Sequence, residues 1–160
     1  KDVICRCDEL GIITDVSHMS DRSFADTARL TKRFIASHSN ARTVCSSGRN
    51  LTNEQFDLIV ARGGLVGLNL YPPFVSDSAD ENSADELFAA LCRHALHFSA
   101  RGGQSALCLG SDRDGIPHAD GYTPLSCVPK LYTALCESGI DKTAADAIFY
   151  GNAERFFQTC

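Results

Sequence analysis

The sequence predicts an α/β fold of four consecutive β/α units, which is half of an eight-stranded, TIM-like β/α barrel. Four short apolar runs alternate with segments of helical pattern, and this alternation favours a parallel sheet with helical crossovers. Two of the runs lead into a histidine and the last leads into an aspartate, so polar side chains are expected at one rim of the sheet. The alternation alone is also compatible with a small, open, doubly wound sheet.

Each strand is predicted by a run of apolar residues that ends in a polar or glycine-rich loop. These runs are too short for typical helices and suit strands that are buried on both faces. Pro72 and Pro73 are expected to end regular pairing after the third run. The predicted strands cover residues 12–17, 33–37, 65–69 and 106–109.

Helices are predicted from caps, apolar periodicity and glycine stops. The chain opens with what looks like the end of a helix over residues 3–10, which Gly11 stops. Ser20 is expected to cap a helix over residues 21–30, and Thr52 opens a capping-box pattern before the next helix. Further helices are expected over residues 84–100, 126–137 and 141–150.

Composition indicates a single globular unit, a partial domain over residues 1–160. The chain is 44% hydrophobic and 22% charged, and no interdomain linker is visible. Its formal net charge of -5 is scattered along the sequence, which argues against nucleic acid or an anionic membrane as the main partner. No apolar stretch approaches the roughly 20 residues needed to cross a bilayer.

The first residue and the cysteines bear on the origin of the chain. Residue 1 is a lysine and Met19 is the only methionine, so we expect the translation start to lie upstream of Lys1, where a lost secretory signal stays an open alternative. The eight cysteines include no CxxC pair of the structural zinc type. Cys92 and Cys108 lie in apolar patterns, so we expect reduced structural thiols and favour a cytoplasmic location. A bridge through Cys45 or an intermolecular disulfide through Cys160 is the other possibility.

Two histidines are the candidate metal ligands. His18 ends the first apolar run and His38 ends the second, so the ends of neighbouring parallel strands would bring their rings together. A neutral imidazole is a good zinc ligand, and a position at the strand end leaves one side of the metal open to water and substrate. The alternative for each ring is a structural hydrogen bond to a neighbouring loop.

Four further residues are candidates for chemistry or substrate binding. Asp112 ends the fourth run and is the candidate catalytic carboxylate, whereas Asp114, beside a glycine, is expected to form a turn. Arg49 is a candidate clamp for a substrate carboxylate, with a solvated loop arginine as the alternative. Asn69 and Tyr71, at the end of the third strand, are expected to line the same cavity or to satisfy loop backbone.

Two other pairs of candidate ligands are discounted as metal sites. His94 and His97 lie three residues apart on a predicted helix, far from the strand ends, and are expected to form a partly exposed polar face. His118 and Asp120 have the His-x-Asp spacing of a metal pair, but they follow a proline in a loop rather than a strand.

Five motifs follow one another along the chain: Thr14-Asp15-Val16-Ser17-His18, Ser37-His38-Ser39-Asn40-Ala41-Arg42, Gly48-Arg49-Asn50, Val66-Gly67-Leu68-Asn69-Leu70-Tyr71 and Gly110-Ser111-Asp112-Arg113-Asp114-Gly115. In this order they resemble the C-terminal half of the renal (membrane) dipeptidase family. The tail, residues 151–157, is similar to the closing helix of that family. The resemblance implies a barrel with two zinc ions that hydrolyses dipeptides and tolerates a D-residue at the C-terminal side.

Carried over residue by residue, the resemblance assigns four roles. His18 and His38 match the two histidine ligands of the family's fifth and sixth strands. Arg49 matches the arginine that binds the carboxylate of the substrate. Asp112 matches the last-strand aspartate, which contacts the substrate amino group and is a candidate to carry the proton from the zinc-activated water to the leaving amine.

Several residues of the family site have no counterpart in the sequence. The His-x-Asp pair of the first strand, the bridging glutamate of the third strand and a histidine that polarises the scissile carbonyl would all lie upstream of Lys1. Two zinc ions therefore require another polypeptide segment, either the N-terminal half of the same barrel or a second chain.

Three functional hypotheses follow. The first is one half of a zinc dipeptidase. The second is a catalytically inactive half-barrel that self-associates into a homo-oligomer as a structural or binding module, because an open four-stranded sheet exposes two edges. The third is a related barrel hydrolase that acts on another amide.

Overall fold

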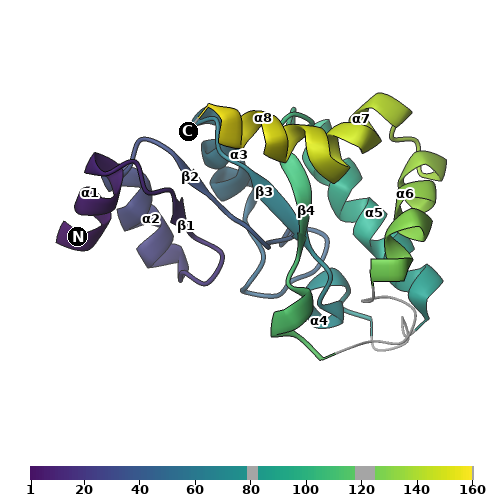
Figure 1. The fold of residues 1–160 in the computed structure, drawn as a ribbon. Helices are drawn as coiled ribbons and strands as arrows, with labels where there is room; N and C mark the ends of the chain where they lie inside the picture. Colours follow the sequence, from purple (N-terminus) through teal and green to yellow (C-terminus); the bar gives the residue numbers. More distant parts are fainter. Residues whose placement is uncertain (79–82, 118–124, 160) are drawn as a thin grey trace.

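The computed structural model describes residues 1–78, 83–117 and 125–159, in which short parallel strands are flanked by helices (Figure 1). The strands are β1 (Thr14–Asp15), β2 (Phe34–Ile35), β3 (Val66–Asn69) and β4 (Leu107–Ser111). The α-helices are α1 (Asp2–Glu9), α2 (Asp21–Leu30), α3 (Asn53–Ala61), α4 (Pro72–Val75), α5 (Ala84–Ala100), α6 (Val128–Glu137), α7 (Lys142–Asp146) and α8 (Asn152–Gln158). Shorter turns of helix are η1 (Arg113–Gly115), η2 (Leu125–Cys127) and the π-helical η3 (Ala147–Gly151).

The four strands are parallel and lie side by side in chain order. β1 pairs with β2, and β3 pairs with β4. Ala36, directly after β2, bridges to Val66 of β3, and the N–H of Gly67 donates to the Ala36 carbonyl at 2.8 Å. Consecutive strands of a β/α barrel have this order, whereas a doubly wound sheet reverses its order at a switch point. The described strands show no such reversal.

The helix predictions that rest on local caps are confirmed. Ser20 caps α2 by accepting a hydrogen bond from the Ser23 N–H at 3.2 Å. Thr52 and Gln55 form the predicted capping box of α3, and α5 begins and ends at the predicted residues. Each of these capping bonds joins residues within one turn of the helix, so the start of the helix does not depend on contacts with distant parts of the chain.

Strand lengths and two helix boundaries differ from the predictions. Only two residues of the predicted strand over 12–17 pair regularly, and Ile12 is 54% exposed rather than buried. β4 extends to Ser111, beyond its predicted end. Pro72 does end the pairing of β3, but it also starts α4, because proline fits the first turn of a helix. The predicted helix over 141–150 is α7, continued by the π-helical turn and α8.

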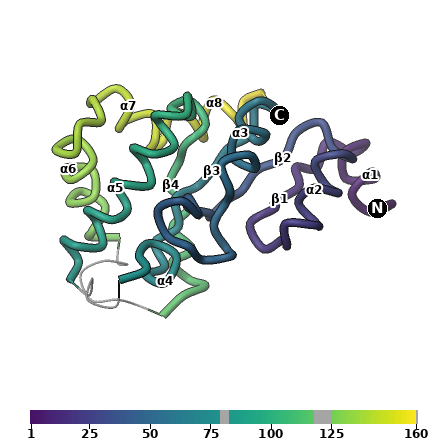
Figure 2. Tube along the Cα trace, turned by 180° about the vertical axis from the view of Figure 1, so that it is seen from behind, coloured from purple at the N-terminus to yellow at the C-terminus, as the bar shows by residue number. Residues whose placement is uncertain are grey.

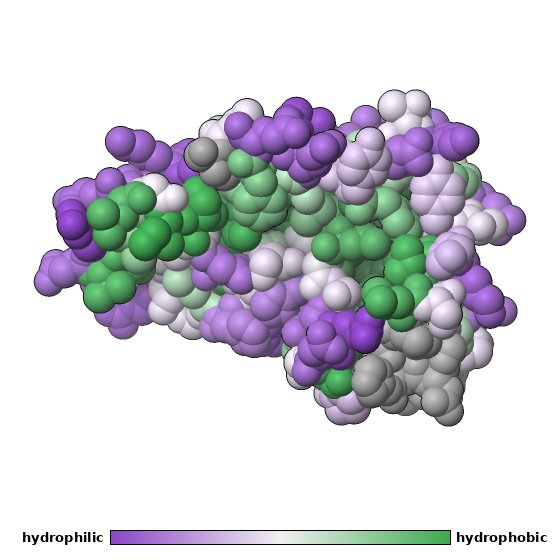
Figure 3. Space-filling view, viewed as in Figure 1, coloured by the Kyte–Doolittle hydropathy of each residue, from purple (hydrophilic) through white to green (hydrophobic). Residues whose placement is uncertain are grey.

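Side chains alternate between the two faces of the sheet. Phe34 and Leu68 belong to the core beneath the helices, where the ring of Phe34 meets that of Phe24 of α2 edge-on at 5.6 Å. Helices α2, α3 and α5 cover this face (Figure 2). Ile35 and Cys108 belong to a smaller cluster on the opposite face. Figure 3 shows hydrophobic side chains spread across this opposite face, which we call the open face. Residues of helix α8 pack against part of it.

Helix α8 closes the sheet at the amino ends of the strands. The side chain of Asn152 donates to the carbonyls of Gln104 and Leu107, the latter at 2.8 Å. The guanidinium of Arg33 lies 3.9 Å from the ring centroid of Phe156. The loops at the carboxyl ends are therefore free to carry polar groups. No helix among the described residues is long and apolar enough to span a membrane.

Two glycines allow β2, β3 and β4 to approach closely on the open face of the sheet. A Cβ atom built on Gly67 or on Gly110 would overlap the backbone oxygen of Ser37. Because a backbone oxygen cannot move aside as a flexible side chain can, only glycine fits at these two positions.

We expect Gly67→Ala to lower the free energy of unfolding by about 1–3 kcal/mol, since the added methyl group must push two strands apart. Urea denaturation measures this change. Gly48→Ala is the matched control, because a Cβ there meets nothing within 4 Å. If both variants unfold at the same urea concentration, the close packing of the strands is wrong.

Candidate metal and substrate site

The imidazoles of His18 and His38 meet at the carboxyl ends of β1 and β2. Their Nε2 atoms are 2.9 Å apart, and their ring centroids are 4.8 Å apart. Each histidine lies three residues beyond the last residue of its strand, so the parallel pairing of β1 with β2 brings the two rings together. The two predicted ligands thus converge on one point.

The surroundings of His38 favour its neutral form. Burial lowers the pKa of His38 below its ordinary value, and the charges of Asp112 and Asp15 oppose this shift. His18 and Arg49 act in the same direction as burial. The charges of the predicted carboxylate and guanidinium thus act on the imidazole in opposite directions. Neutral imidazole is the form that binds metal ions.

Asp112 is held at the end of β4 in an unusual conformation. Its φ of 58° lies in the left-handed region, which costs free energy for a residue other than glycine and is common at functional sites. Its Oδ2 accepts a hydrogen bond of 3.2 Å from Nδ2 of Asn69. The same Nδ2 also donates to the carbonyl of His38 at 3.2 Å. Asn69 is fully buried, so it links Asp112 to the loop of His38.

Arg49 and Tyr71 both lie beside the ring of Phe74. The guanidinium of Arg49 is 5.4 Å from the ring centroid of Phe74, and the ring of Tyr71 meets Phe74 edge-on at 4.9 Å. Nη2 of Arg49 and the hydroxyl of Ser39 are buried and have no hydrogen-bond partner. Both residues line a void of about 10 Å³. An unpaired buried donor costs about 1–3 kcal/mol, which a polar ligand group would recover.

The described residues do not by themselves bring together a full set of metal ligands. No group of three or more histidine, cysteine, aspartate or glutamate side chains converges among residues 1–78, 83–117 and 125–159. His18 and His38 are well placed for one ion, because two ligands of a tetrahedral zinc ion lie about 3.3 Å apart. Opening the pair by a few tenths of an ångström would admit the metal.

Two residues that hold the ring of His38, Ser37 and Asp15, were not predicted as site residues. The hydroxyl of Ser37 lies 2.7 Å from Nδ1 of His38, and the carboxylate of Asp15 accepts the Ser37 hydroxyl. One signal could have revealed them, because a serine precedes each of the two histidines in the sequence.

The prediction for His94 was wrong. This side chain is fully buried instead of partly exposed, and it supports the loop that follows His38. Its Nδ1 accepts a hydrogen bond of 3.0 Å from the backbone N–H of Ala41, and its Nε2 donates to the carbonyl of Val75 at 2.8 Å. His97 is partly buried and bonds to Asn53 at 2.8 Å. His94 is therefore a structural histidine.

We expect the stability of the protein to fall as the pH drops from about 6.5 towards 4, because burial lowers the pKa of His94 to about 4. The bond to Val75 and the charge of Asp77 oppose the shift, whereas Arg93 and His97 add to it. The unfolded chain takes up a proton first, at a cost to the folded state of about 3 kcal/mol.

This prediction is measured as the free energy of unfolding between pH 7 and pH 4. His94→Gln removes the titrating group and is expected to flatten most of that part of the profile. His97→Gln is the comparison and should change the profile less, because burial also lowers the pKa of His97 but this side chain is only partly buried. Equal pH dependence in all three proteins would refute the role of His94.

The remaining sequence predictions concern Asp114, the discounted pair and the cysteines. The Asp114 side chain is 95% exposed in a helical turn, as predicted for a turn residue. His118, Asp120 and Cys160 lie outside the described residues. Among the described residues, Cys45 is buried and forms no disulfide, and the same holds for Cys92 and Cys108.

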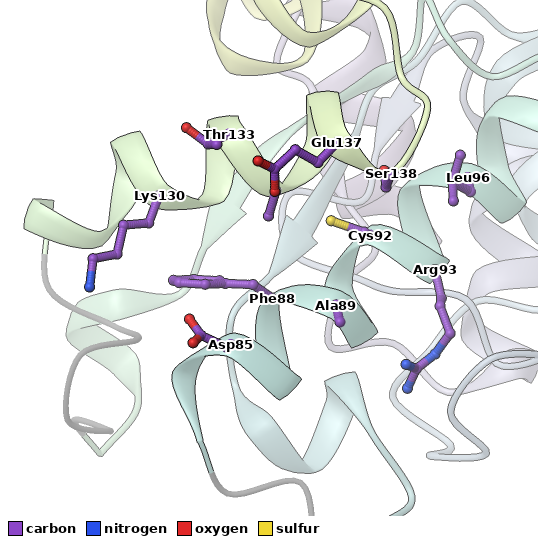
Figure 4. A pocket seen from close by; sticks show the side chains of 11 residues that line it. Asp85, Phe88, Ala89, Cys92, Arg93, Leu96, Lys130, Thr133, Glu137 and Ser138 are labelled. Carbon is purple, nitrogen blue, oxygen red and sulfur yellow. The ribbon is translucent and has the colours of Figure 1, made fainter.

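A groove of about 720 Å³ lies between α5 and α6, lined by residues of these helices such as Phe88, Cys92 and Lys130 (Figure 4). None of the predicted site residues lines it. Of the predicted site residues, Arg49 borders the small void described above. That void is far below the roughly 300 Å³ of a typical small-ligand pocket.

Comparison with known sequences connects the chain to a peptidase family. The family profile described as membrane dipeptidase (peptidase family M19) matches residues 1–160. A protein from the pqqA 5' region of Klebsiella pneumoniae is 34% identical over 152 residues, which cover 94% of this chain and 56% of that protein. An uncharacterized dipeptidase of Schizosaccharomyces pombe is 32% identical over 137 residues, covering 84% of this chain and 32% of the relative.

Comparison with solved structures also finds peptidases of this kind. A metallopeptidase from Rhodobacter sphaeroides, liganded with a phosphinate mimic of the dipeptide L-Ala-D-Ala, matches with a TM-score of 0.89 and 29% identity over 98% of this chain. The probable dipeptidase PvdM from Pseudomonas aeruginosa, at 20% identity and a TM-score of 0.82, shows the same fold. This chain spans 45% of the first protein and 52% of the second. The chain therefore belongs to the membrane dipeptidase family, peptidase family M19.

Proposed function

We propose that this chain supplies one half of the active site of a zinc-dependent dipeptidase. The convergence of His18 and His38 at 2.9 Å, at the rim that also carries Asp112 and Arg49, is the observation that carries the proposal. In this proposal the four sequential parallel strands are the C-terminal half of an eight-stranded barrel. The half-length match to solved family members supports this architecture.

His18 and His38 are the residues of this chain that would hold zinc. Two imidazole nitrogens are half of a tetrahedral ligand set, so the completing segment must supply the remaining ligands of this ion and those of a second ion. When bound, zinc lowers the pKa of a coordinated water and polarises a carbonyl, which is the chemistry that peptide hydrolysis needs.

Two other residues act on the substrate. Arg49 binds the terminal carboxylate of the dipeptide, because its buried Nη2 lacks a partner and a guanidinium suits a carboxylate. Asp112 binds the substrate amino group and passes a proton to the nitrogen of the leaving residue. Asn69 holds the Asp112 carboxylate in place, and Tyr71 packs edge-on against Phe74, the ring that also lies beside the Arg49 guanidinium. A dipeptide such as L-Ala-D-Ala is the proposed substrate class.

The completing partner covers the open face of the sheet. Hydrophobic side chains spread across this face (Figure 3). Leu10 and Ile12, which precede β1 in the chain, are 56% and 54% exposed. Such surface is normally buried against protein. A second copy of the chain could cover the same face without forming a catalytic site, and this inactive homo-oligomer is the second candidate.

Hydrolysis of L-Ala-D-Ala separates the two candidates. We expect the complete enzyme, meaning this chain joined to the segment that completes the barrel, to release alanine in the presence of zinc. A chelator should abolish the activity. A zinc-free, inactive homodimer of this chain as the only stable assembly would support the second candidate instead.

A further inference from the structure

The carboxylate of Asp15 gathers four hydrogen-bond donors from the ends of β1 and β2. Its Oδ1 accepts from the N–H of Ser17 at 3.0 Å, from the hydroxyl of Ser17 at 2.8 Å and from the N–H of Ser37 at 3.0 Å. Its Oδ2 accepts from the hydroxyl of Ser37. Asp15 faces the strand ends because it is the last residue of β1, in register with Ile35 of β2.

The direction of these bonds fixes the proton on His38. Burial by itself would raise the pKa of Asp15, but the bonds from Ser37 and Ser17 outweigh it and lower the pKa, so the carboxylate is ionised and can only accept. The single hydroxyl proton of Ser37 therefore points to Asp15. Its oxygen presents a lone pair to Nδ1 of His38 at 2.7 Å, so Nδ1 must carry the ring proton.

We propose that Asp15 and Ser37 are positioning residues that hold His38 with its proton on Nδ1 and the lone pair of its Nε2 aimed at His18. The part of this inference that concerns metal rests on the proposed function, because a zinc ligand must offer a bare nitrogen. The relay runs from the Asp15 carboxylate through the Ser37 hydroxyl to the imidazole. It links β1 to β2 through side chains as well as backbone.

Ser17 provides an internal comparison. Its hydroxyl also donates to Asp15, and its oxygen accepts from the backbone N–H of His38 at 3.0 Å. Ser17 thus holds the backbone of His38, whereas the hydrogen-bond partner of the ring nitrogen Nδ1 is Ser37. If the carboxylate only ties the two strands together, loss of either hydroxyl should have the same effect. If the relay sets the ring proton, only Ser37 should matter to it.

The test is the tautomer of His38, read from ring nitrogen shifts in ¹⁵N-labelled chain without metal. We expect the wild type to hold the proton on Nδ1, and Ser37→Ala and Asp15→Asn to populate the form protonated on Nε2. Ser17→Ala is the matched control and should keep the wild-type tautomer, while Ser37→Thr restores the hydroxyl and should rescue it.

Zinc is then titrated into the same proteins and followed by the Nε2 resonance of His38. We expect Ser37→Ala to weaken zinc binding by about 10–100-fold and Ser17→Ala to change it much less. If Ser37→Ala keeps the wild-type tautomer, the relay is wrong, regardless of the zinc affinity of that variant. A shifted tautomer without any zinc response, even in the complete enzyme, upholds the relay and contradicts the proposed zinc site.

Discussion

Replacing Arg49 by methionine in the complete enzyme is expected to lower kcat/KM for a dipeptide by about 10²–10³-fold. Two hydrogen bonds between a guanidinium and a carboxylate contribute about 3–4 kcal/mol, and methionine keeps the apolar length of the side chain while removing both. The buried, unpaired Nη2 indicates that this free energy becomes available when a ligand binds. Steady-state kinetics on L-Ala-D-Ala measure the loss.

A substrate without the terminal carboxylate isolates this contact. The dipeptide amide should be a poor substrate for the wild type, and Arg49→Met should lower its kcat/KM little further, because the two changes remove the same interaction. Arg101→Met is a control at a distance, since Arg101 pairs with Asp57 on the outer surface. Equal losses on the dipeptide and on its amide would show that Arg49 does not bind the carboxylate.

Replacing Asp112 by asparagine is expected to lower kcat by about 10²–10⁴-fold, the usual contribution of a positioned proton carrier. Asparagine has almost the same shape and its oxygen can still accept from Nδ2 of Asn69, so the loop conformation should survive. It cannot carry a proton between the attacking water and the leaving amine. The kcat for L-Ala-D-Ala is therefore the quantity to follow.

Asp114 offers a matched control for this change. It lies two residues further along the same turn, and its side chain is 95% exposed. We expect Asp114→Asn to retain the wild-type kcat within about twofold, since surface substitutions of this kind have small effects. A kcat for Asp112→Asn close to that of Asp114→Asn would remove Asp112 from the reaction.

The fold was largely predictable where local signals decide it. Ser20 and Thr52 begin their helices through bonds to residues three positions away, so the sequence alone places those boundaries well. Strand lengths were less predictable, because they depend on pairing between distant residues. Isoleucine is a typical strand residue, yet Ile12 lies before the first paired residue of β1 and stays exposed.

The candidate site was predictable as a set of positions but not as a network. His18 and His38 follow from the rule that parallel strands end at one rim. The bonds that fix His38 depend on Asp15 and Ser37, which the pairing of β1 with β2 brings together although they are 22 residues apart. His94 was misplaced for the same reason, since its partner Ala41 is 53 residues away.

The most direct test of the proposal is the zinc content of the complete enzyme, measured by elemental analysis after extensive dialysis. We predict about two zinc ions per barrel, the count of a two-metal hydrolase, and about one in the variant with both His18→Ala and His38→Ala. His97→Ala, the control, should keep the wild-type content. Full zinc occupancy in the double variant would contradict the assignment of His18 and His38 as metal ligands.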